Sequence, residues 1–343
     1  MKQKKLKEID QDIIEQIQAI RENKNNKVVI IPHINPDGDA IGSAMALYYF
    51  FSESNECNII SPNDIPDFLH WLPQIEQITN CEKKFTKAQK LIQEANLIII
   101  ADHNATDRSG KCEEAIQKST ATKLMIDHHP EPQYPVDLSI SSIQVSSTAE
   151  LTFGFIHSIA SKAINRNIAS ALYLGIMTDT GNFMHNIHPN TFAIVNNLMS
   201  YNIDRDEIYT QVFNNFSAER MQLMGYALYK KMEILADLHT AIISLDQDEL
   251  QKFNYQKGDT EGFVNLPLSI KDVKISILIM NKEGSIKLSF RSKGDIAINQ
   301  IAQKYFNGGG HKNAAGAESL LGIEETITKL KTALSENINT LIK

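Results

Sequence analysis

The sequence predicts an α/β protein of two domains: an open, mainly parallel sheet with helices on both faces, followed by a smaller α+β domain. Three observations support this prediction. The chain has 343 residues, about twice the size of a common single domain. Short apolar runs alternate with helix-like segments in the first half, as in a parallel sheet with crossover helices. In the last third, strand-like runs joined by hairpin signals replace that alternation.

The predicted elements of the first half follow one another along the chain. An amphipathic pattern with several acidic residues over 6–21 predicts a leading helix. Short apolar runs then predict buried parallel strands, separated by segments of helical spacing. The strands are expected at 28–31, 97–101 and 123–126, and the helices at 40–51 and 105–119. Right-handed crossovers would place these helices on both faces of the sheet.

Helical patterns dominate the middle of the chain. They cover 149–165 and 168–177, although spacing alone allows either a helix or a strand at 171–177. Beyond them, strands are expected at 241–245, 273–280 and 286–290, a hairpin turn at 282–284 and a closing helix at 323–342. The predicted domains are therefore 1–195 and 231–343, joined by a helical connector at 196–230.

The charge distribution argues against binding of long nucleic acids. The chain has 34 Lys and Arg against 41 Asp and Glu, a formal charge of -7. Residues 1–229 carry -8 and residues 230–343 carry +1. A strongly basic surface is therefore not expected, and a nucleic-acid partner would have to be short. The acidity of the first part indicates either a solvated surface or a site for cations.

Cysteine usage and hydropathy predict a cytoplasmic protein without a membrane anchor. Cys57, Cys81 and Cys112 are odd in number and form no C-x-x-C pair, so neither a disulfide framework nor a thiolate zinc site is expected. The longest apolar runs are far shorter than the roughly 18 residues of a membrane span.

Histidine and aspartate side chains follow each predicted strand of the first domain. Because parallel strands end at the same edge of a sheet, these residues should converge. Imidazoles with several carboxylates and no thiolate suit Mn²⁺, Mg²⁺, Co²⁺ or Zn²⁺. Four carboxylates are more than one open catalytic ion needs, and they suit two ions that clamp a phosphoryl group. The candidate ligands are His33, Asp37, Asp39, Asp102, His128, His129 and Asp179.

The loop that carries the first candidates has local features that favour ligation. Pro36 fixes φ and Gly38 permits a sharp turn, so that Asp37 and Asp39 can face neighbouring ions. A Pro-Asp-Gly β-turn is the alternative for this segment alone. Small residues at 42–44 are expected to let the following helix pack closely on the sheet.

Six separated motifs resemble those of the DHH phosphoesterase superfamily with its DHH-associated C-terminal domain. The first domain carries H-I-N-P-D-G-D-A-I-G-S from His33, then Asp102, D-H-H at 127–129 and D-T-G from Asp179. The second carries S-F-R-S at 289–292 and G-G-G-H-K-N-A-A-G from Gly308. The resemblance covers nearly the whole chain after the first 25 or so residues.

The resemblance implies a role for each residue of the first domain. His33 and Asp37 would hold one Mn²⁺ ion, and Mg²⁺ or Co²⁺ are alternatives. A second ion would be held by Asp39, His128 and Asp179, with Asp102 bridging the two. His129 would face the scissile phosphate, and Asp127 would either orient the neighbouring histidine or cap the end of its strand. His103 is expected to be a solvated loop histidine.

The resemblance also implies that the second domain binds the substrate, with the active site in the cleft between the domains. Glycine N–H groups allow close approach to a phosphate, and an arginine offers a bidentate fork, although a glycine-rich hairpin is the alternative for the glycines alone. The resemblance assigns substrate binding to Arg291, Ser292, Gly308, Gly309, Gly310 and His311. The Ala/Gly run that follows His311 is expected to begin a helix.

Four further residues stay open. Arg108 could reach a substrate phosphate or pair at the surface. Trp71 could stack a base, but packing in a loop or core is favoured. His103 and His185 could line the site, but loop solvation is favoured for both.

Within the superfamily, the compact two-domain chain resembles most the oligoribonuclease/pAp phosphatases. The expected activity is Mn²⁺-dependent hydrolysis of short oligoribonucleotides to mononucleotides, of adenosine 3′,5′-bisphosphate (pAp) to AMP, or of both, by two-metal in-line attack of hydroxide. A soluble cyclic di-AMP or pApA phosphodiesterase is the alternative of the same class. A non-catalytic nucleotide sensor is the alternative of a different class. A homodimer is compatible with the chain.

Overall fold

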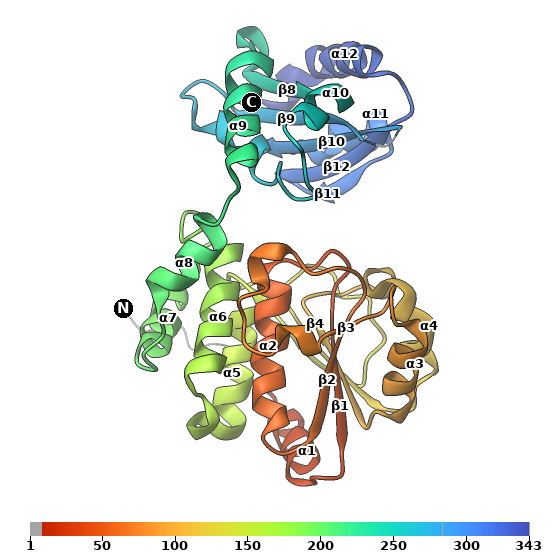
Figure 1. Cartoon of the computed structure of the whole chain (residues 1–343), viewed down its shortest axis with the longest axis vertical. Coiled ribbons are helices and arrows are strands. Elements are labelled where there is room, and N and C mark those ends of the chain that lie inside the picture. The colour runs from red at the N-terminus through yellow and green to blue at the C-terminus, as the bar shows by residue number, and fades with distance from the viewer. Residues whose placement is uncertain (1–8, 283, 343) are drawn as a thin grey trace. The chain divides into compact units, whose positions relative to one another are not determined.

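The computed structural model describes residues 9–282 and 284–342, and they form two compact units (Figure 1). The first unit ends at Asn215 and the second begins at Phe216. This division lies within the segment 196–230 that the sequence analysis assigns to a connector. The placement of the active site in a cleft between the units stays a prediction.

The first unit is built on a six-stranded, fully parallel sheet. Its strand order is β3-β2-β1-β4-β5-β6. The strands are β1 (Lys27–Pro32), β2 (Glu56–Ser61), β3 (Thr79–Asn80), β4 (Leu97–Ala101), β5 (Thr122–Asp127) and β6 (Leu138–Ser141). The predicted parallel sheet is confirmed, and the three strands expected from apolar runs are its central members.

Helices cover both faces of this sheet, as predicted (Figure 1). Side chains alternate along β1, so that Val28 and Ile30 enter the core under one helix layer while Val29 and Ile31 enter the other. One layer comprises α1 (Gln11–Glu22), α2 (Gly38–Ser52), α5 (Thr148–Ala160) and α6 (Arg166–Asp179). The other comprises α3 (Phe85–Glu94) and α4 (Glu113–Lys118).

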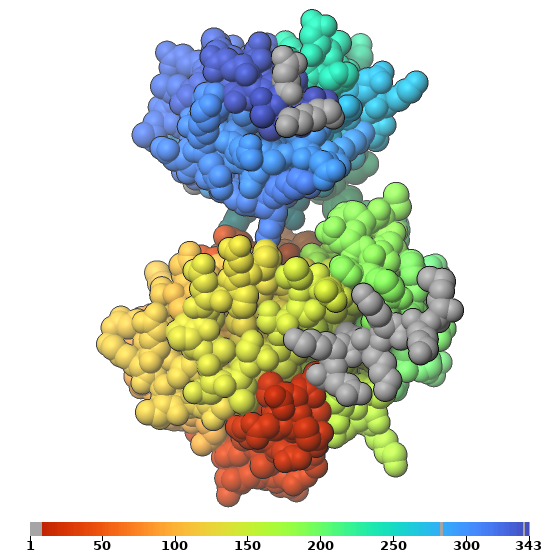
Figure 2. Space-filling view, turned by 180° about the vertical axis from the view of Figure 1, so that it is seen from behind, coloured from red at the N-terminus to blue at the C-terminus, as the bar shows by residue number. Residues whose placement is uncertain are grey.

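Three details of these helices resolve, correct or limit what the sequence predicts. The ambiguous segment 171–177 is helical, within α6. A Cβ at Gly42 would lie 2.5 Å from the Ala171 carbonyl oxygen, so this glycine permits close approach of α2 to α6 rather than to the sheet as expected. α1, red in Figure 2, buries Ile13 and Ile17 against the first core, whereas the part of its predicted helix at 6–8 lies outside the described residues.

Three helices follow in the segment expected to be mostly helical, namely α7 (Thr191–Met199), α8 (Arg205–Phe213) and α9 (Ala218–Tyr226). α7 and α8 belong to the first unit and α9 to the second. None of the described helices is both long and apolar enough to span a bilayer.

The second unit is built on a mixed six-stranded sheet of order β11-β12-β10-β9-β8-β7, in which only β8 and β9 pair in parallel. Its strands are β7 (Met232–Leu235), β8 (Thr240–Leu245), β9 (Ile275–Lys282), β10 (Ser285–Ser292), β11 (Gly309–His311) and β12 (Ala314–Ser319). The helices α11 (Asn299–Phe306) and α12 (Ile323–Leu341) cover one face, and α9 and α10 (Gln247–Lys252) pack on the other. The predicted α+β class is confirmed.

The Ala/Gly run after His311 is not a helix start, and that prediction is wrong. Ala314 to Ser319 form strand β12, which pairs antiparallel with both β10 and β11. Alanine favours helices in isolation, but here the pairing with two neighbouring strands decides the conformation. The glycine-rich segment is therefore the hairpin that the sequence analysis kept as an alternative.

Candidate active site

The carboxyl edge of the parallel sheet gathers the candidate ligands of the first unit. Three sets of His and Asp side chains offer ligand atoms that lie within 4.8 Å of one another. The first set is His33, Asp37 and Asp102, the second is Asp39, His128 and Asp179, and the third is Asp102, His128 and His129. His33, Asp102 and His128 thus lie close together because β1, β4 and β5 all end at this edge, and Asp179 reaches the same edge from the end of α6.

The first set presents one imidazole nitrogen to two carboxylates. His33 Nε2 lies 3.5 Å from Asp102 Oδ2 and 3.9 Å from Asp37 Oδ1. The other ring nitrogen, Nδ1, lies 2.8 Å from the Ile34 carbonyl oxygen and so acts as the donor. A neutral His33 in this tautomer turns its Nε2 lone pair toward the carboxylates, which is how a histidine presents itself to a cation.

Asp102 is a member of the first and third sets, and it faces the second set through His128. Its Oδ2 faces His33, while its Oδ1 lies 3.6 Å from His128 Nε2. His128 Nε2 also lies 3.6 Å from Asp179 Oδ2 and 4.0 Å from Asp39 Oδ2. One carboxylate with an oxygen toward each set has the arrangement of a bridging ligand.

The backbone of Asp102 is held in an unusual conformation. Its φ is +63°, in the left-handed region that a short polar residue adopts more readily than most. The Thr148 hydroxyl donates a hydrogen bond of 2.7 Å to Asp102 Oδ1. Because Asp102 is 2% exposed, this bond holds a carboxylate that has almost no contact with water.

The amino end of α5 holds Asp39, a support that sequence reasoning missed. The Thr148 N–H donates to Asp39 Oδ2 at 2.6 Å and the Ala149 N–H donates to Asp39 Oδ1 at 2.9 Å. Two backbone donors at a helix start favour a negative charge. Ser147 caps α5 through Glu150 N–H, and an N-cap serine was the one visible signal of this helix start.

The electrostatics of the clustered carboxylates fit divalent cations. Burial, and then the nearby charge of Asp102, raises the pKa of Asp179 to about 8, and the same two causes raise the pKa of Asp39 well above its ordinary value. Burial opposes ionisation of Asp102 as well, but the nearby imidazoles of His33 and His128 outweigh it and lower its pKa. Carboxylates this close repel one another unless cations lie between them. The donor set therefore fits hard or borderline divalent ions.

Asp127 and His129 form a fixed pair beside these sets. Asp127 is fully buried, and its Oδ1 accepts from His129 Nδ1 at 2.7 Å while its Oδ2 accepts from the His129 N–H at 2.9 Å. One carboxylate thus both caps the end of β5 and fixes the ring. The Nε2 of His129 points the other way and lies 3.3 Å from Arg108 Nη1.

His103 is not the solvated loop residue that the sequence analysis expected. It is fully buried, with Nδ1 3.1 Å from the Ala101 carbonyl oxygen and Nε2 3.0 Å from Ser109 Oγ. The Tyr134 hydroxyl lies 2.8 Å from the same Ser109 oxygen. Burial lowers the pKa of His103 to about 3, so the ring stays neutral and joins the loop after β4 to the core.

The substrate-binding candidates lie together in the second unit, around the glycine-rich hairpin. Gly308 and Gly309 line a shallow hollow with residues of β10 and β12, and His311 is exposed on β11. Arg291 near the end of β10 is partly buried and donates to the Phe290 carbonyl oxygen at 2.9 Å. The buried Ser292 hydroxyl instead donates to the Ile296 carbonyl oxygen and accepts from Asn313, so it shapes the loop.

Neither Trp71 nor His185 joins the three His/Asp sets. Trp71 is partly buried and packs against the first core, in agreement with the packing role that was favoured. His185 is exposed, and its ring lies over Gly181, where an added Cβ would meet the imidazole.

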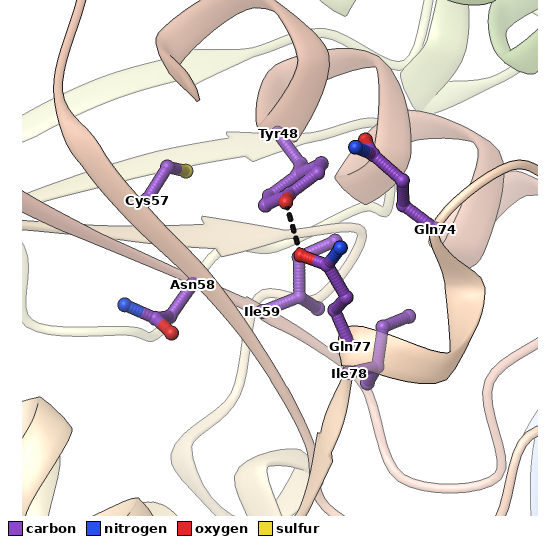
Figure 3. Close-up of a pocket in the computed structure, with 7 residues that line it drawn as sticks. All are labelled: Tyr48, Cys57, Asn58, Ile59, Gln74, Gln77 and Ile78. Carbon is purple, nitrogen blue, oxygen red and sulfur yellow. Dashed lines mark hydrogen bonds between the residues drawn. The ribbon is translucent and has the colours of Figure 1, made fainter.

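A small hollow elsewhere in the first unit carries no comparable chemistry (Figure 3). It lies between the end of α2 and the start of β2, and the Tyr48 hydroxyl donates to Gln77 Oε1 across it at 2.6 Å. Its lining contains no carboxylate or imidazole, namely Tyr48, Cys57, Asn58, Ile59, Gln74, Gln77 and Ile78.

Family models match both units of the chain. The DHH family, N-terminal domain, matches residues 27–176, and the DHHA1 domain matches residues 238–340. A crystal structure of an exopolyphosphatase-related protein from Bacteroides fragilis is 39% identical, covers 98% of this chain and 100% of its own, and has a TM-score of 0.95. The chain belongs to the DHH family. The family resemblance expected from the sequence is confirmed, and with it the class of enzyme, a phosphoric-ester hydrolase.

Several curated relatives of the DHH-family chain have names that state an activity, and two of them are compared with it below. The probable bifunctional oligoribonuclease and PAP phosphatase NrnA of Streptococcus mutans is 28% identical over 312 residues, which are 90% of this chain and 94% of the relative. The cyclic-di-AMP phosphodiesterase GdpP of Bacillus subtilis is 26% identical over 328 residues, which are 91% of this chain and 48% of the relative. This DHH chain thus matches nearly the whole of the first relative and about half of the second.

Proposed function

We propose that this DHH protein hydrolyses short oligoribonucleotides to mononucleotides and removes the 3′-phosphate of adenosine 3′,5′-bisphosphate. The observation that carries the proposal is the position of Asp102 at the carboxyl edge of the first sheet, with one oxygen toward His33 of the first His/Asp set and the other toward His128 of the second. Similarity to the NrnA relative over 94% of that relative's length supports this choice of substrates.

The residues that would hold cations follow from the two sets. His33 and Asp37 would bind one ion, Asp39, His128 and Asp179 the other, and Asp102 both. A mixed imidazole and carboxylate donor set favours Mn²⁺, with Mg²⁺ or Co²⁺ as alternatives. When bound, such ions would supply charge neutralisation at the phosphate and a water activated at neutral pH.

The side chains of the chain itself would position the phosphate for in-line displacement. Asp127 holds His129 through two hydrogen bonds, so the Nε2 face of the ring points away from that carboxylate. From this position His129 would stabilise charge on a phosphate oxygen or give a proton to the leaving oxygen. Asp127 would thus act through His129, by fixing its tautomer and direction.

The glycine-rich hairpin of the second unit and Arg291 would bind another phosphate of the substrate and so select a short molecule with a free end. The exposed strand β11 and the hollow beside Gly308 and Gly309 leave main-chain groups accessible there. The net charge of -7 disfavours binding along a long phosphate backbone. A cytoplasmic location and a homodimer stay predictions.

A second candidate is the hydrolysis of cyclic di-AMP or its linear product pApA. The match to the cyclic-di-AMP phosphodiesterase over 91% of this chain favours it. The metal sets do not distinguish the candidates, because the same displacement at phosphorus serves both. The distinction would lie in the substrate-binding residues of the second unit.

A substrate panel tests both candidates. The purified protein with Mn²⁺ would be given pAp, 5′-phosphorylated di- to pentaribonucleotides, cyclic di-AMP, pApA, pyrophosphate and polyphosphate, and kcat/KM would be compared. We expect the highest kcat/KM for the short ribonucleotides and pAp. A preference for cyclic di-AMP or pApA would favour the second candidate, and metal binding without any turnover would favour the nucleotide sensor.

A further inference from the structure

Arg108 is a cation beside the His/Asp sets, and the proposed function assigns it no role. It lies in the 3₁₀ segment Thr106–Cys112, and its side chain is half-buried. Its Nη1 lies 3.3 Å from His129 Nε2, and its charge also acts on the His33 imidazole. We propose that Arg108 binds the substrate phosphate on which His129 acts. This inference rests on the proposed function and deepens it.

The contact with His129 shows where the Arg108 guanidinium points. Asp127 occupies the Nδ1 side of the ring, so the guanidinium meets the ring on its opposite, Nε2 side. Both groups therefore converge on one point at the edge of the site. A phosphate oxygen at that point would replace the imidazole nitrogen as the acceptor for Arg108, and it would lie within reach of His129 as well.

The contacts of Arg108 argue against a role in which it neutralises the charge of the nearby carboxylates. Within residues 9–282 and 284–342, no carboxylate oxygen forms an ion pair with Arg108, although four carboxylates lie in the neighbouring sets. A guanidinium that served to offset those acids would contact at least one of them. The Arg108 guanidinium carries five N–H donors, and one of them is directed at His129. The remaining donors could bind an oxyanion.

The main chain around Arg108 is anchored on both sides. The Ile34 N–H donates to the Arg108 carbonyl oxygen at 2.7 Å, which joins this segment to the loop that carries Asp37 and Asp39. The next residue, Ser109, is fully buried and bonded to both His103 and Tyr134. The hydrogen bonds of His103 and Tyr134 to Ser109 therefore fix the backbone position from which the Arg108 side chain extends. Anchoring of this kind lets a side chain bind without reorganising its backbone.

Phosphate binding to the Mn²⁺-loaded full chain tests the proposal. Inorganic phosphate is the probe, and its dissociation constant is measured by calorimetry for the wild type, Arg108→Gln and Arg108→Lys. We expect Arg108→Gln to weaken phosphate binding at least tenfold and Arg108→Lys by less, because lysine keeps the charge but loses the fork. Lys111→Gln, an exposed cation of the same segment, should change the constant less than twofold. The Mn²⁺ affinity of Arg108→Gln should stay within twofold of the wild type.

A second background separates direct contact from an effect through His129. In His129→Ala, the added Arg108→Gln change should still weaken phosphate binding severalfold if the guanidinium touches the phosphate. Loss of the Arg108 effect in that background, unchanged phosphate affinity in Arg108→Gln, or no phosphate binding by the wild type would each overturn the proposal. If phosphate binding depends on Arg108 while no nucleotide of the panel is hydrolysed, the role of Arg108 stands and the proposed function fails.

Discussion

The carboxyl edge of the first sheet and the glycine-rich hairpin of the second are built in opposite ways. At the first, the candidate groups are side chains, and Asp39, Asp102 and Asp127 are at most 2% exposed. At the second, Gly309, Gly310 and His311 are exposed, and the backbone itself is the accessible surface. The difference suggests a division of labour, in which a rigid buried centre would perform the reaction and an open edge would select the substrate.

The largest expected effect concerns Asp102, which lies between the first and the second His/Asp set. Asp102→Asn keeps the shape of the side chain but removes its charge, so we expect kcat/KM to fall on the order of 10³-fold or more and Mn²⁺ stoichiometry to drop. Steady-state kinetics and calorimetry would measure both. Asp107→Asn, at an exposed aspartate nearby, should leave both unchanged. Full activity of Asp102→Asn would remove the bridging role.

The next effect tests how tightly the buried centre is packed. A Cβ at Gly175 would lie 2.7 Å from Ala149 Cβ and 2.8 Å from Asp39 Oδ1. Gly175→Ala should therefore lower the free energy of unfolding by about 2 kcal/mol and weaken Mn²⁺ binding. Gly154→Ala is the matched control, since it lies in α5 with no atom within 4 Å of its new Cβ. Denaturant titration of the two variants would measure the difference, and equal stabilities would contradict the packing argument.

The open edge should behave differently from the centre. Arg291→Ala removes a partly buried guanidinium of the second unit, and we expect KM for pAp to rise about tenfold with little change in kcat or Mn²⁺ affinity. Lys293→Ala, which removes a nearby exposed cation, should have no comparable effect. A fall in Mn²⁺ affinity in Arg291→Ala would show that the two regions are not independent.

The smallest effect probes the support of Asp102 and Asp39 by α5. Thr148→Val deletes the hydroxyl that donates to Asp102 but keeps the N–H that donates to Asp39, so Mn²⁺ affinity should fall about tenfold at most. Thr148→Ser restores the hydroxyl and should restore the affinity. If Thr148→Ser binds Mn²⁺ as weakly as Thr148→Val, the hydrogen bond is not the cause.

The candidate ligands could be predicted from the sequence, but the residues that hydrogen-bond to them could not. Strand ends followed by His33, Asp102 and His128 could be recognised, because a parallel sheet brings its carboxyl ends together. The donors to Asp39 come from Thr148 and Ala149, more than 100 residues away, and no local pattern predicts such a contact.

Two wrong predictions have the same physical origin. His103 was expected in solvent because it follows a strand, yet its two hydrogen bonds allow it to be buried. The run from Ala314 was expected to be a helix because alanine favours one, yet two strands pair with it. In both cases contacts made in the folded chain decide the outcome, those of Ser109 and Tyr134 around His103 and those of β10 beside β12, and local propensity does not report them.

The two sets of ligands are completed at different points of synthesis. The first set needs the chain only as far as Asp102, whereas the second needs Asp179 at the end of α6. Asp39 also stays without its backbone donors until α5 has emerged and packed. A growing chain would therefore have no complete centre until most of the first unit had left the ribosome, and cation uptake would report that this unit has folded.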